Sequence, residues 1–266
     1  MGTENENNSN FRKILVIILS SITGAALVYF SVMCILAPVR KLREINEKYT
    51  FQPDARNKID ERINSDSAYL KLLKEKSFLQ SRIAMAESDS IYVTINIPDS
   101  TIDLEICGVV VHSTKIQKMS ISNIIKSGNE YIISSMLSKP FSIEKSFSTI
   151  PKEPLMIKMA PKDTSEFVPD AVPDTAYHEP VNYVLEMSNG TRIFVYQAEF
   201  PHAGDKMHLF KFDMKYRLQN TFNAIKSISV FKVPEYHPFI KIRVPMADAK
   251  IIYRALPVHG QIAVYR

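Results

Sequence analysis

Residues 14–39 read ILVIILSSITGAALVYFSVMCILAPV, a run of 26 residues without a charged side chain. Basic pairs stand directly before and after it, at positions 12–13 and 40–41. A helix needs about 20 apolar residues to cross a bilayer, and the core helices of soluble proteins rarely run so far without a charge. A cleaved secretory signal has a shorter apolar stretch. The run therefore predicts a retained transmembrane helix over residues 12–41.

The charges beside the predicted span do not indicate the localisation that we expect. Positive residues favour the cytoplasmic side, and the carboxyl flank, with Arg40, Lys41, Arg43 and Lys48, carries more of them than the amino flank. This count would place the large domain inside the cell. The family resemblance described below favours the outside. We therefore expect a single-pass inner-membrane protein with its large C-terminal domain in the periplasm.

The composition of the whole chain excludes several classes of protein. Hydrophobic residues make up 45% and charged residues 23%, as in a folded protein, and about 220 residues follow the span. The net charge of +5 fits contact with an anionic surface, but no arginine-rich tract suggests nucleic acid. Seven glycines without a GxGxxG or GxxxxGK[ST] motif argue against a phosphate-binding loop.

One segment lies on each side of the predicted span. Residues 1–11 are polar and predict a disordered tail. Residues 42–89 predict a juxtamembrane helical stalk. The helix itself is expected over residues 57–87, because these residues include no glycine or proline and repeat apolar side chains near helical spacing. Two interpretations stay open: a stalk or coiled coil that joins two copies, or a helix packed on its own domain.

The period changes from helical to two at Ser90, where we expect a β-rich domain over residues 90–266. Residues 91–97 and 102–106 alternate around turn residues and predict a hairpin whose second strand continues through 109–111. A second hairpin, 183–187 with 192–196, flanks Asn189-Gly190, the pair preferred in a tight primed turn.

The rest of this domain mixes helices with strands. Six prolines at positions 151–180 predict irregular chain with one short strand, 155–159. The pattern then predicts the following elements: a helix over 213–228, a strand over 239–244, a helix over 249–256 capped by Asp248, and a last strand over 261–265. The fold class that we expect is α+β.

The sequence offers no recognisable catalytic, cofactor-binding or metal-binding residues. Among six histidines the only local cluster is His202, Asp205 and His208, which we interpret as solvated loop residues because Gly204 argues against a helix there. Cys34 lies in the span, so it cannot pair with Cys107. Cys107 falls in an alternating strand pattern without a basic neighbour, which predicts a buried, inert thiol.

Both ends of the β-rich domain resemble the L,D-transpeptidase (YkuD-type) family. The opening, IYVTINI at 91–97 followed by TIDLEI at 101–106, looks like the first hairpin of that family. The close, DAKIIYRALPVHGQIAVY at 248–265, is similar to its final helix and strand. The middle of the domain is unmatched. The resemblance implies an envelope protein with an L,D-transpeptidase-like domain.

The chain lacks the catalytic residues of that family. L,D-transpeptidases carry a Ser-His-Gly-Cys block whose thiolate attacks the peptide, and this chain has no cysteine after Cys107. Its only His-Gly pair, His259-Gly260, lies at the end of the chain. A cysteine–histidine mechanism needs both groups within hydrogen-bond reach. The resemblance therefore implies a pseudoenzyme.

These observations predict a membrane-anchored envelope protein without catalysis that binds peptidoglycan or a partner protein. Two alternatives stay open. One is a structural subunit of an envelope-spanning secretion or motility complex, in which the helix over 57–87 joins copies of the chain. The other is an enzyme that acts on cell-wall peptides through an unrecognised site. In all three cases the partners are a membrane and cell-envelope components, with no cofactor and no nucleic acid.

Overall fold

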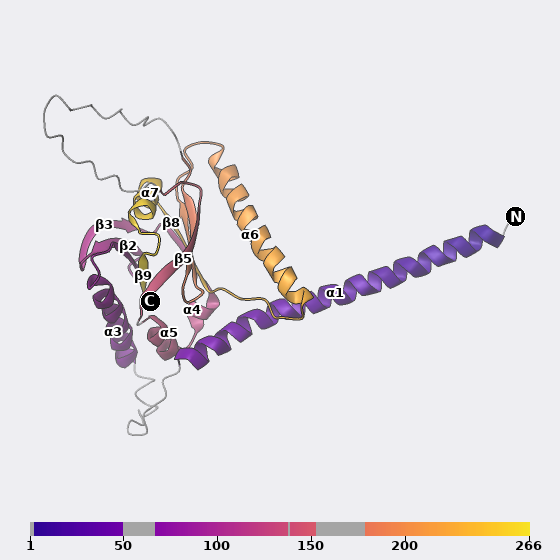
Figure 1. Cartoon of the computed structure of the whole chain (residues 1–266), viewed down its shortest axis with the longest axis horizontal. Helices are drawn as coiled ribbons and strands as arrows, with labels where there is room; N and C mark the ends of the chain where they lie inside the picture. The colour runs from indigo at the N-terminus through magenta and orange to yellow at the C-terminus, as the bar shows by residue number, and fades with distance from the viewer. Residues whose placement is uncertain (1–2, 50–66, 138, 153–178) are drawn as a thin grey trace, which may run out of the picture. The chain divides into compact units, whose positions relative to one another are not determined.

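The computed structural model describes residues 3–49, 67–137, 139–152 and 179–266 (Figure 1). The chain forms two compact units, which are described separately. A helical unit comprises residues 1–48 and 216–237, and a sheet unit comprises residues 49–215 and 238–266. The described residues are mixed α+β, as predicted. Their helices are α1 (Thr3–Tyr49), α3 (Ser67–Ala86), α4 (Asn123–Ser127), α5 (Glu130–Leu137), α6 (Asp205–Ser229) and α7 (Met246–Ala255).

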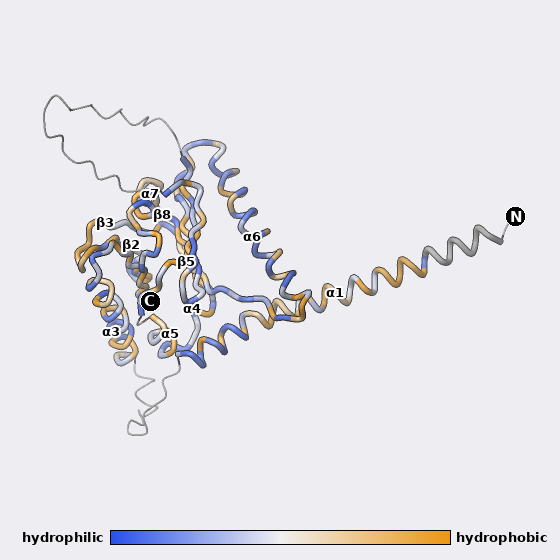
Figure 2. The backbone as a smooth tube through the Cα atoms, viewed as in Figure 1, coloured by the Kyte–Doolittle hydropathy of each residue, from blue (hydrophilic) through white to orange (hydrophobic). Residues whose placement is uncertain are grey.

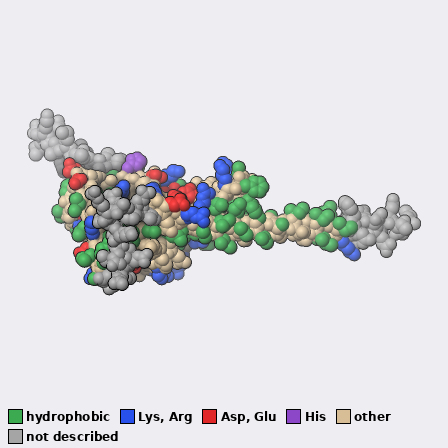
Figure 3. All heavy atoms as spheres, turned by 90° about the horizontal axis from the view of Figure 1, so that it is seen from below, with side chains coloured by type: hydrophobic (Ala, Val, Ile, Leu, Met, Phe, Trp, Pro, Cys, Tyr) green, Lys and Arg blue, Asp and Glu red, His purple; other side chains and the backbone are tan. Residues whose placement is uncertain are grey.

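Helix α1 is the one described helix that is long and apolar enough to cross a membrane, over Lys13–Tyr49. Apolar residues predominate in the coloured part of this helix (Figure 2), and Figure 3 shows hydrophobic side chains on its surface. The helix already begins at Thr3, within the tail that we predicted to be disordered, and it continues past residue 41 to Tyr49. Extending an existing helix by one residue costs little compared with starting a new one, which accounts for both extensions.

The sheet unit contains nine described strands in one mixed sheet, in the order β3-β2-β1-β9-β5-β6-β7-β8-β4. The pairs β1–β9 and β7–β8 are parallel, and the other neighbouring pairs are antiparallel. The strands are β1 (Tyr92–Asn96), β2 (Thr101–Ile106), β3 (Val109–Lys115), β4 (Lys118–Ile121), β5 (Phe141–Ser148), β6 (Asn182–Met187), β7 (Arg192–Gln197), β8 (Phe239–Val244) and β9 (Gln261–Tyr265).

Helices cover both faces of this sheet. Neighbouring residues of a strand point to opposite faces, and Leu104 and Glu105 are neighbours on β2. Glu105 binds Arg82 of α3, whereas Leu104 lies opposite His112, which binds Asp248 of α7. Helix α3 therefore covers one face and α7 the other.

Helix α3 packs on the sheet with a face that we did not predict. Met85 is buried with Tyr92 of β1, and the Phe78 ring lies 5.1 Å from the Tyr265 ring of β9. The apolar stripe that we expected comprises Tyr69, Leu72, Leu73, Leu79 and Ile83. Of these, Leu72, Leu79 and Ile83 are exposed, whereas Tyr69 and Leu73 are half-buried. The contacts match the interpretation of a helix packed on its own domain. A role in joining copies through the exposed stripe stays a prediction, and residues 57–66 of the expected helix lie outside the described ranges.

The helix predicted over 213–228 is longer than expected. Helix α6 begins at Asp205, directly after Gly204, so His208 lies in a helix and the prediction of a loop there is wrong. Gly204 precedes the helix and does not interrupt it. The buried carboxylate of Asp205 accepts a hydrogen bond from the backbone N–H of His202, which stabilises the start of the helix.

The predicted strands are largely confirmed, and so is the turn between β1 and β2, where the N–H of Ser100 bonds to the carbonyl of Ile97. The first hairpin, the strand over 239–244 and the last strand lie where we expected them. The predicted continuation through 109–111 is wrong, because the chain turns after Ile106 and residues 109–111 begin the antiparallel strand β3. The second hairpin is also present, but only Gly190 has a positive φ, of 78°, and its N–H bonds to the carbonyl of Met187. This is a type I turn with a bulge and not the predicted primed turn. The strand predicted over 155–159 lies outside the described residues.

Candidate functional site

The unpaired edge of β3 is an exposed apolar part of the sheet unit. Strand β3 ends the sheet, and no described strand pairs with its free side. Val109, Val110 and Val111 stand at its start and are 63%, 47% and 55% exposed. Native proteins usually protect such an edge, because its unpaired N–H and C=O groups can pair with another chain.

A buried carboxylate supports this edge from within the sheet. Glu105 lies on β2, directly opposite Val110 of β3, and its side chain is almost fully buried. One of its oxygens accepts hydrogen bonds from the Arg82 guanidinium, at 2.8 and 3.1 Å, and from the Tyr92 hydroxyl, at 3.1 Å. The other accepts one from the Thr94 hydroxyl at 2.6 Å. A buried charge is tolerated only when it is paired and hydrogen-bonded in this way.

The same network fixes the turn that leads into β3. Burial, followed by the neighbouring Glu105 carboxylate, raises the pKa of the Tyr92 phenol above its usual range. The hydroxyl therefore stays protonated and donates to Glu105, while it accepts a hydrogen bond from the N–H of Gly108 at 3.0 Å. The local pattern of the sequence does not predict this network. Its one signal is Glu105 itself, a charged residue between two apolar ones in a predicted strand.

Cys107 lies in this turn, and the prediction that it is buried in a strand is wrong. Cys107 and Gly108 have φ values of 48° and 82° and form the two-residue turn between β2 and β3. Positive φ at both central residues is typical of a primed turn, which points the cysteine outward. The thiol is exposed and lies 3.7 Å from the carboxylate of Asp89.

The histidine nearest to this edge pairs with a carboxylate. His112 of β3 lies 3.0 Å from Asp248 of α7, whose second oxygen accepts a hydrogen bond from the Thr114 hydroxyl at 2.6 Å. Asp248 therefore does not cap α7 as predicted, and the residue at the N-cap position is Pro245. A carboxylate can orient a histidine as a general base. However, the Thr114 hydroxyl donates to Asp248 and not to the imidazole, so these three residues do not form a nucleophile–base pair.

The remaining predicted residues do not gather into a site. His202 and His208 are exposed on the chain around the start of α6, and Asp205 is buried beneath them. His259 lies 3.2 Å from the backbone carbonyl of Ile143. Within the described part of the chain, no group of three or more His, Cys, Asp and Glu side chains is arranged to hold a metal ion.

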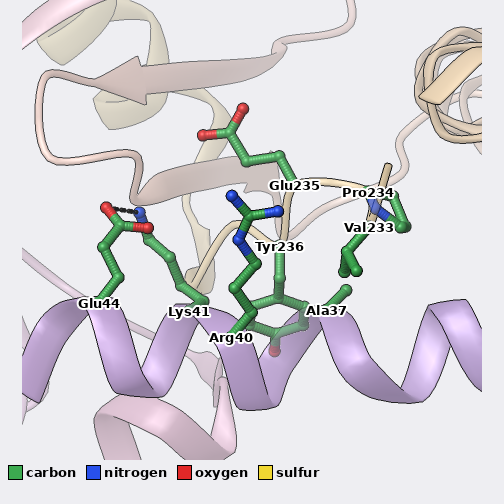
Figure 4. A pocket seen from close by; sticks show the side chains of 8 residues that line it. All are labelled: Ala37, Arg40, Lys41, Glu44, Val233, Pro234, Glu235 and Tyr236. Atoms are coloured by element: carbon green, nitrogen blue, oxygen red, sulfur yellow. Dashed lines mark hydrogen bonds and ion pairs between the residues drawn. The ribbon is translucent and has the colours of Figure 1, made fainter. Parts of the chain in front are cut away.

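The helical unit contains a pocket of about 270 Å³ between α1 and residues 233–236 (Figure 4). Arg40, Lys41 and Glu44 project from α1 toward Glu235 and Tyr236. Lys41 is nearly buried, and its ammonium group lies 2.9 Å from the Glu44 carboxylate. Two cations and two carboxylates line a space at the lower limit for a small-molecule site. We therefore interpret this pocket as the packing seam that holds residues 233–236 against α1.

Comparison of the chain with protein-family models, with curated proteins and with solved structures gives no match. The resemblance to L,D-transpeptidases therefore depends on the residues quoted above.

Proposed function

We propose that this chain is a single-pass membrane protein of the cell envelope whose sheet unit binds a partner protein through the edge of β3. The observation that carries the proposal is the run of three exposed valines on an unpaired strand. An extended segment added to such an edge gains backbone hydrogen bonds along the strand and side-chain contacts on both faces. Helix α1 would supply the anchor.

We also propose that the sheet unit is a degenerate L,D-transpeptidase domain. Its two resembling ends support this, because they are neighbours in the sheet: β1 pairs with β9, with Val93 opposite Ile262. The absence of the family's cysteine block favours binding without catalysis. The one cysteine in this unit, Cys107, has a carboxylate and not a histidine beside it.

The chemistry of the edge favours a protein segment over a peptidoglycan peptide. Peptidoglycan peptides carry carboxylates, and cations would have to receive them. The exposed start of β3 is apolar, and the cationic side chain of this strand, Lys115, stands at its far end. An extended apolar segment of another protein fits this arrangement better.

Site-specific photo-crosslinking in the cells that make the protein tests the proposal. A benzophenone amino acid placed at Val111 of the full chain should give one discrete adduct with a different protein. Val258 is the matched control, because it is a valine of the same unit with the same exposure as Val109, 63%, and it should give no such adduct. Val109→Lys together with Val111→Glu should abolish pulldown of the identified protein.

Three results would overturn the proposal. The first is equal crosslinking at Val111 and Val258. The second is an adduct that contains only a second copy of this chain, since the edge would then serve self-assembly. The third is sedimentation of the full chain with purified peptidoglycan that is lost in the double variant, which would make the edge a peptidoglycan site.

A further inference from the structure

One face of α6 is apolar and exposed from Met207 to Ile225. Its large side chains recur every three or four residues, which places them on one stripe, and they are between 40% and 69% exposed. Tyr216 on the opposite face is buried, and so is Ile228, which follows the stripe at the end of the helix. Soluble monomers rarely leave so continuous an apolar surface uncovered. The stripe consists of Met207, Phe210, Met214, Leu218, Phe222 and Ile225.

The charged residues beside this stripe are basic. Five Lys and Arg side chains of α6 are exposed, whereas its two acidic residues are not: Asp205 is buried, and Asp213 accepts a hydrogen bond from Tyr196. Apolar stripes with basic borders are typical of helices that lie in the interface of an anionic bilayer. The five basic residues are Lys206, Lys211, Lys215, Arg217 and Lys226.

The end of α6 carries an aromatic residue where glycine is usual. The N–H of Phe231 bonds to the carbonyl of Ile228, and the N–H of Lys232 bonds to that of Ser227. These two bonds define a Schellman motif, in which the residue at the position of Phe231 takes a left-handed conformation and is usually glycine. Phe231 has a φ of 54° and is 82% exposed, the highest value among the exposed large apolar side chains of the described residues. Residues in strained backbone conformations cluster at functional sites, so the exposed Phe231 side chain is a candidate contact residue.

The tip of α6 lies against the apolar part of α1. The Tyr29 hydroxyl lies 3.5 Å from the carbonyl of Ile228, and the Tyr29 and Phe231 ring centroids are 6.0 Å apart. All three residues belong to the helical unit. Tyr29 precedes Val39, the end of the uncharged run, by ten residues, which is about 15 Å along a helix.

The thickness of a bilayer then places this tip inside it. The uncharged run would be about 39 Å long as a helix, against a hydrocarbon core of about 30 Å. Even if the whole excess of about 9 Å lay beyond the core at the carboxyl end, Tyr29 would be about 6 Å below the core boundary. The chain then returns along α1, because residues 233–236 face Ala37 to Glu44 across the seam shown in Figure 4.

We propose that the C-terminal half of α6 is an interfacial helix and that Val230 and Phe231 form a wedge that enters an anionic lipid bilayer beside α1. The stripe rests on the acyl boundary, and its basic borders face the lipid phosphates. The bonds at the end of the helix pair the N–H groups of Val230, Phe231 and Lys232, which lowers the cost of placing this turn in lipid. The proposal rests on the proposed anchoring by α1.

Tryptophan fluorescence tests this placement directly, because the chain contains no tryptophan. The full-length protein is reconstituted into vesicles of phosphatidylcholine and phosphatidylglycerol with brominated acyl chains, one variant at a time. Val28→Trp, in the middle of α1, reports whether α1 spans. Phe231→Trp and Phe222→Trp report the wedge and the stripe, and Gln219→Trp, exposed outside the stripe, is the aqueous control.

The expected order of quenching is Val28→Trp and Phe231→Trp strongest, Phe222→Trp intermediate, and Gln219→Trp close to none. Quenching at Phe222→Trp should grow with the share of phosphatidylglycerol. Quenching at Val28→Trp without quenching at Phe231→Trp would overturn the wedge and leave the anchor intact. Absence of quenching at Val28→Trp would overturn the anchor. A blue-shifted but unquenched Phe222→Trp would show that a second copy covers the stripe, which also overturns the proposal.

Discussion

The start of β3 and the stripe of α6 are both exposed and apolar, yet they differ in everything that surrounds them. The valines of β3 are consecutive, so they face both sides of a strand whose backbone is unpaired. The stripe of α6 repeats with helical spacing, its backbone bonds are satisfied within the helix, and four lysines and one arginine lie beside it. Its end contacts Tyr29 of the apolar helix α1.

This difference shows that exposed apolar area alone does not identify a partner. A free strand edge needs a partner that supplies backbone hydrogen bonds, which another polypeptide can do and a lipid cannot. A helix face needs only an apolar medium, and basic borders suit that medium to the headgroups of an anionic bilayer. The two surfaces are therefore expected to respond independently to substitution.

The largest expected effect is a complete separation of the two surfaces. Val109→Lys with Val111→Glu should remove the protein adduct at β3 and leave bromolipid quenching at Phe231→Trp unchanged. Leu218→Glu with Phe222→Glu should do the reverse, because a charge buried at the acyl boundary is costly. Photo-crosslinking and quenching are measured on all variants. Loss of both signals in either double variant would mean that one partner covers both surfaces.

The second largest expected effect is the labelling of Cys107, which should be nearly complete or nearly absent, depending on the side of the membrane on which the sheet unit lies. In a Cys34→Ser background, Cys107 is the sole thiol and is exposed. A membrane-impermeant maleimide should label it in cells whose inner membrane is intact, if the sheet unit lies in the periplasm. The Cys107→Ala variant, which keeps Cys34 in the span, should stay unlabelled. Labelling that requires lysis of the inner membrane would support the flanking charge count and a cytoplasmic domain.

Much of the fold was predictable, because hydrophobic period is a local signal. The uncharged run predicted α1, and alternation predicted β1, β2, β8 and β9. The turns were harder, because Cys107-Gly108 carries only one glycine and lies inside an unbroken apolar pattern. The start of α6 was missed because Gly204 was interpreted as a break, although it stands just outside the helix.

The interaction surfaces could not be predicted, because they depend on strand order and on contacts between distant residues. Nothing local distinguishes Val109 from the valine of a central strand, and the edge position follows only from the sheet order. Glu105 and Arg82 are 23 residues apart, and Tyr29 and Phe231 are about 200 apart. The period of α6 was visible in sequence, but such a stripe usually indicates a packed face.

The third effect, of intermediate size, concerns the support of β3. Arg82→Ala leaves the buried Glu105 carboxylate without its cation and should lower the free energy of unfolding by about 2 kcal/mol, less than for a fully buried pair because Arg82 is partly exposed. The midpoint of thermal unfolding, followed by circular dichroism in detergent, should fall by about 4–8 °C.

Lys74→Ala on the same helix is the control, because it removes a more exposed ion pair with Glu130 and should change the midpoint little. Quenching at Phe231→Trp should be unaffected. Equal midpoints for the two variants would show that Glu105 does not support the edge.

The smallest expected effect separates the backbone strain at Phe231 from the contribution of its ring to membrane contact. Phe231→Gly removes a side chain from a left-handed position and should stabilise the fold in detergent by up to about 1 kcal/mol. Ser100→Gly is the matched control, because Ser100 has the same φ of 54° and lies in the turn between β1 and β2. Both variants should raise the unfolding midpoint slightly, since glycine takes this conformation without a steric penalty. Only Phe231→Gly should also weaken bromolipid quenching of a tryptophan at position 222, because only it removes apolar area from the bilayer. If both glycine variants leave that quenching unchanged, the Phe231 ring makes no contribution to membrane contact, and the contact depends on the α6 stripe alone.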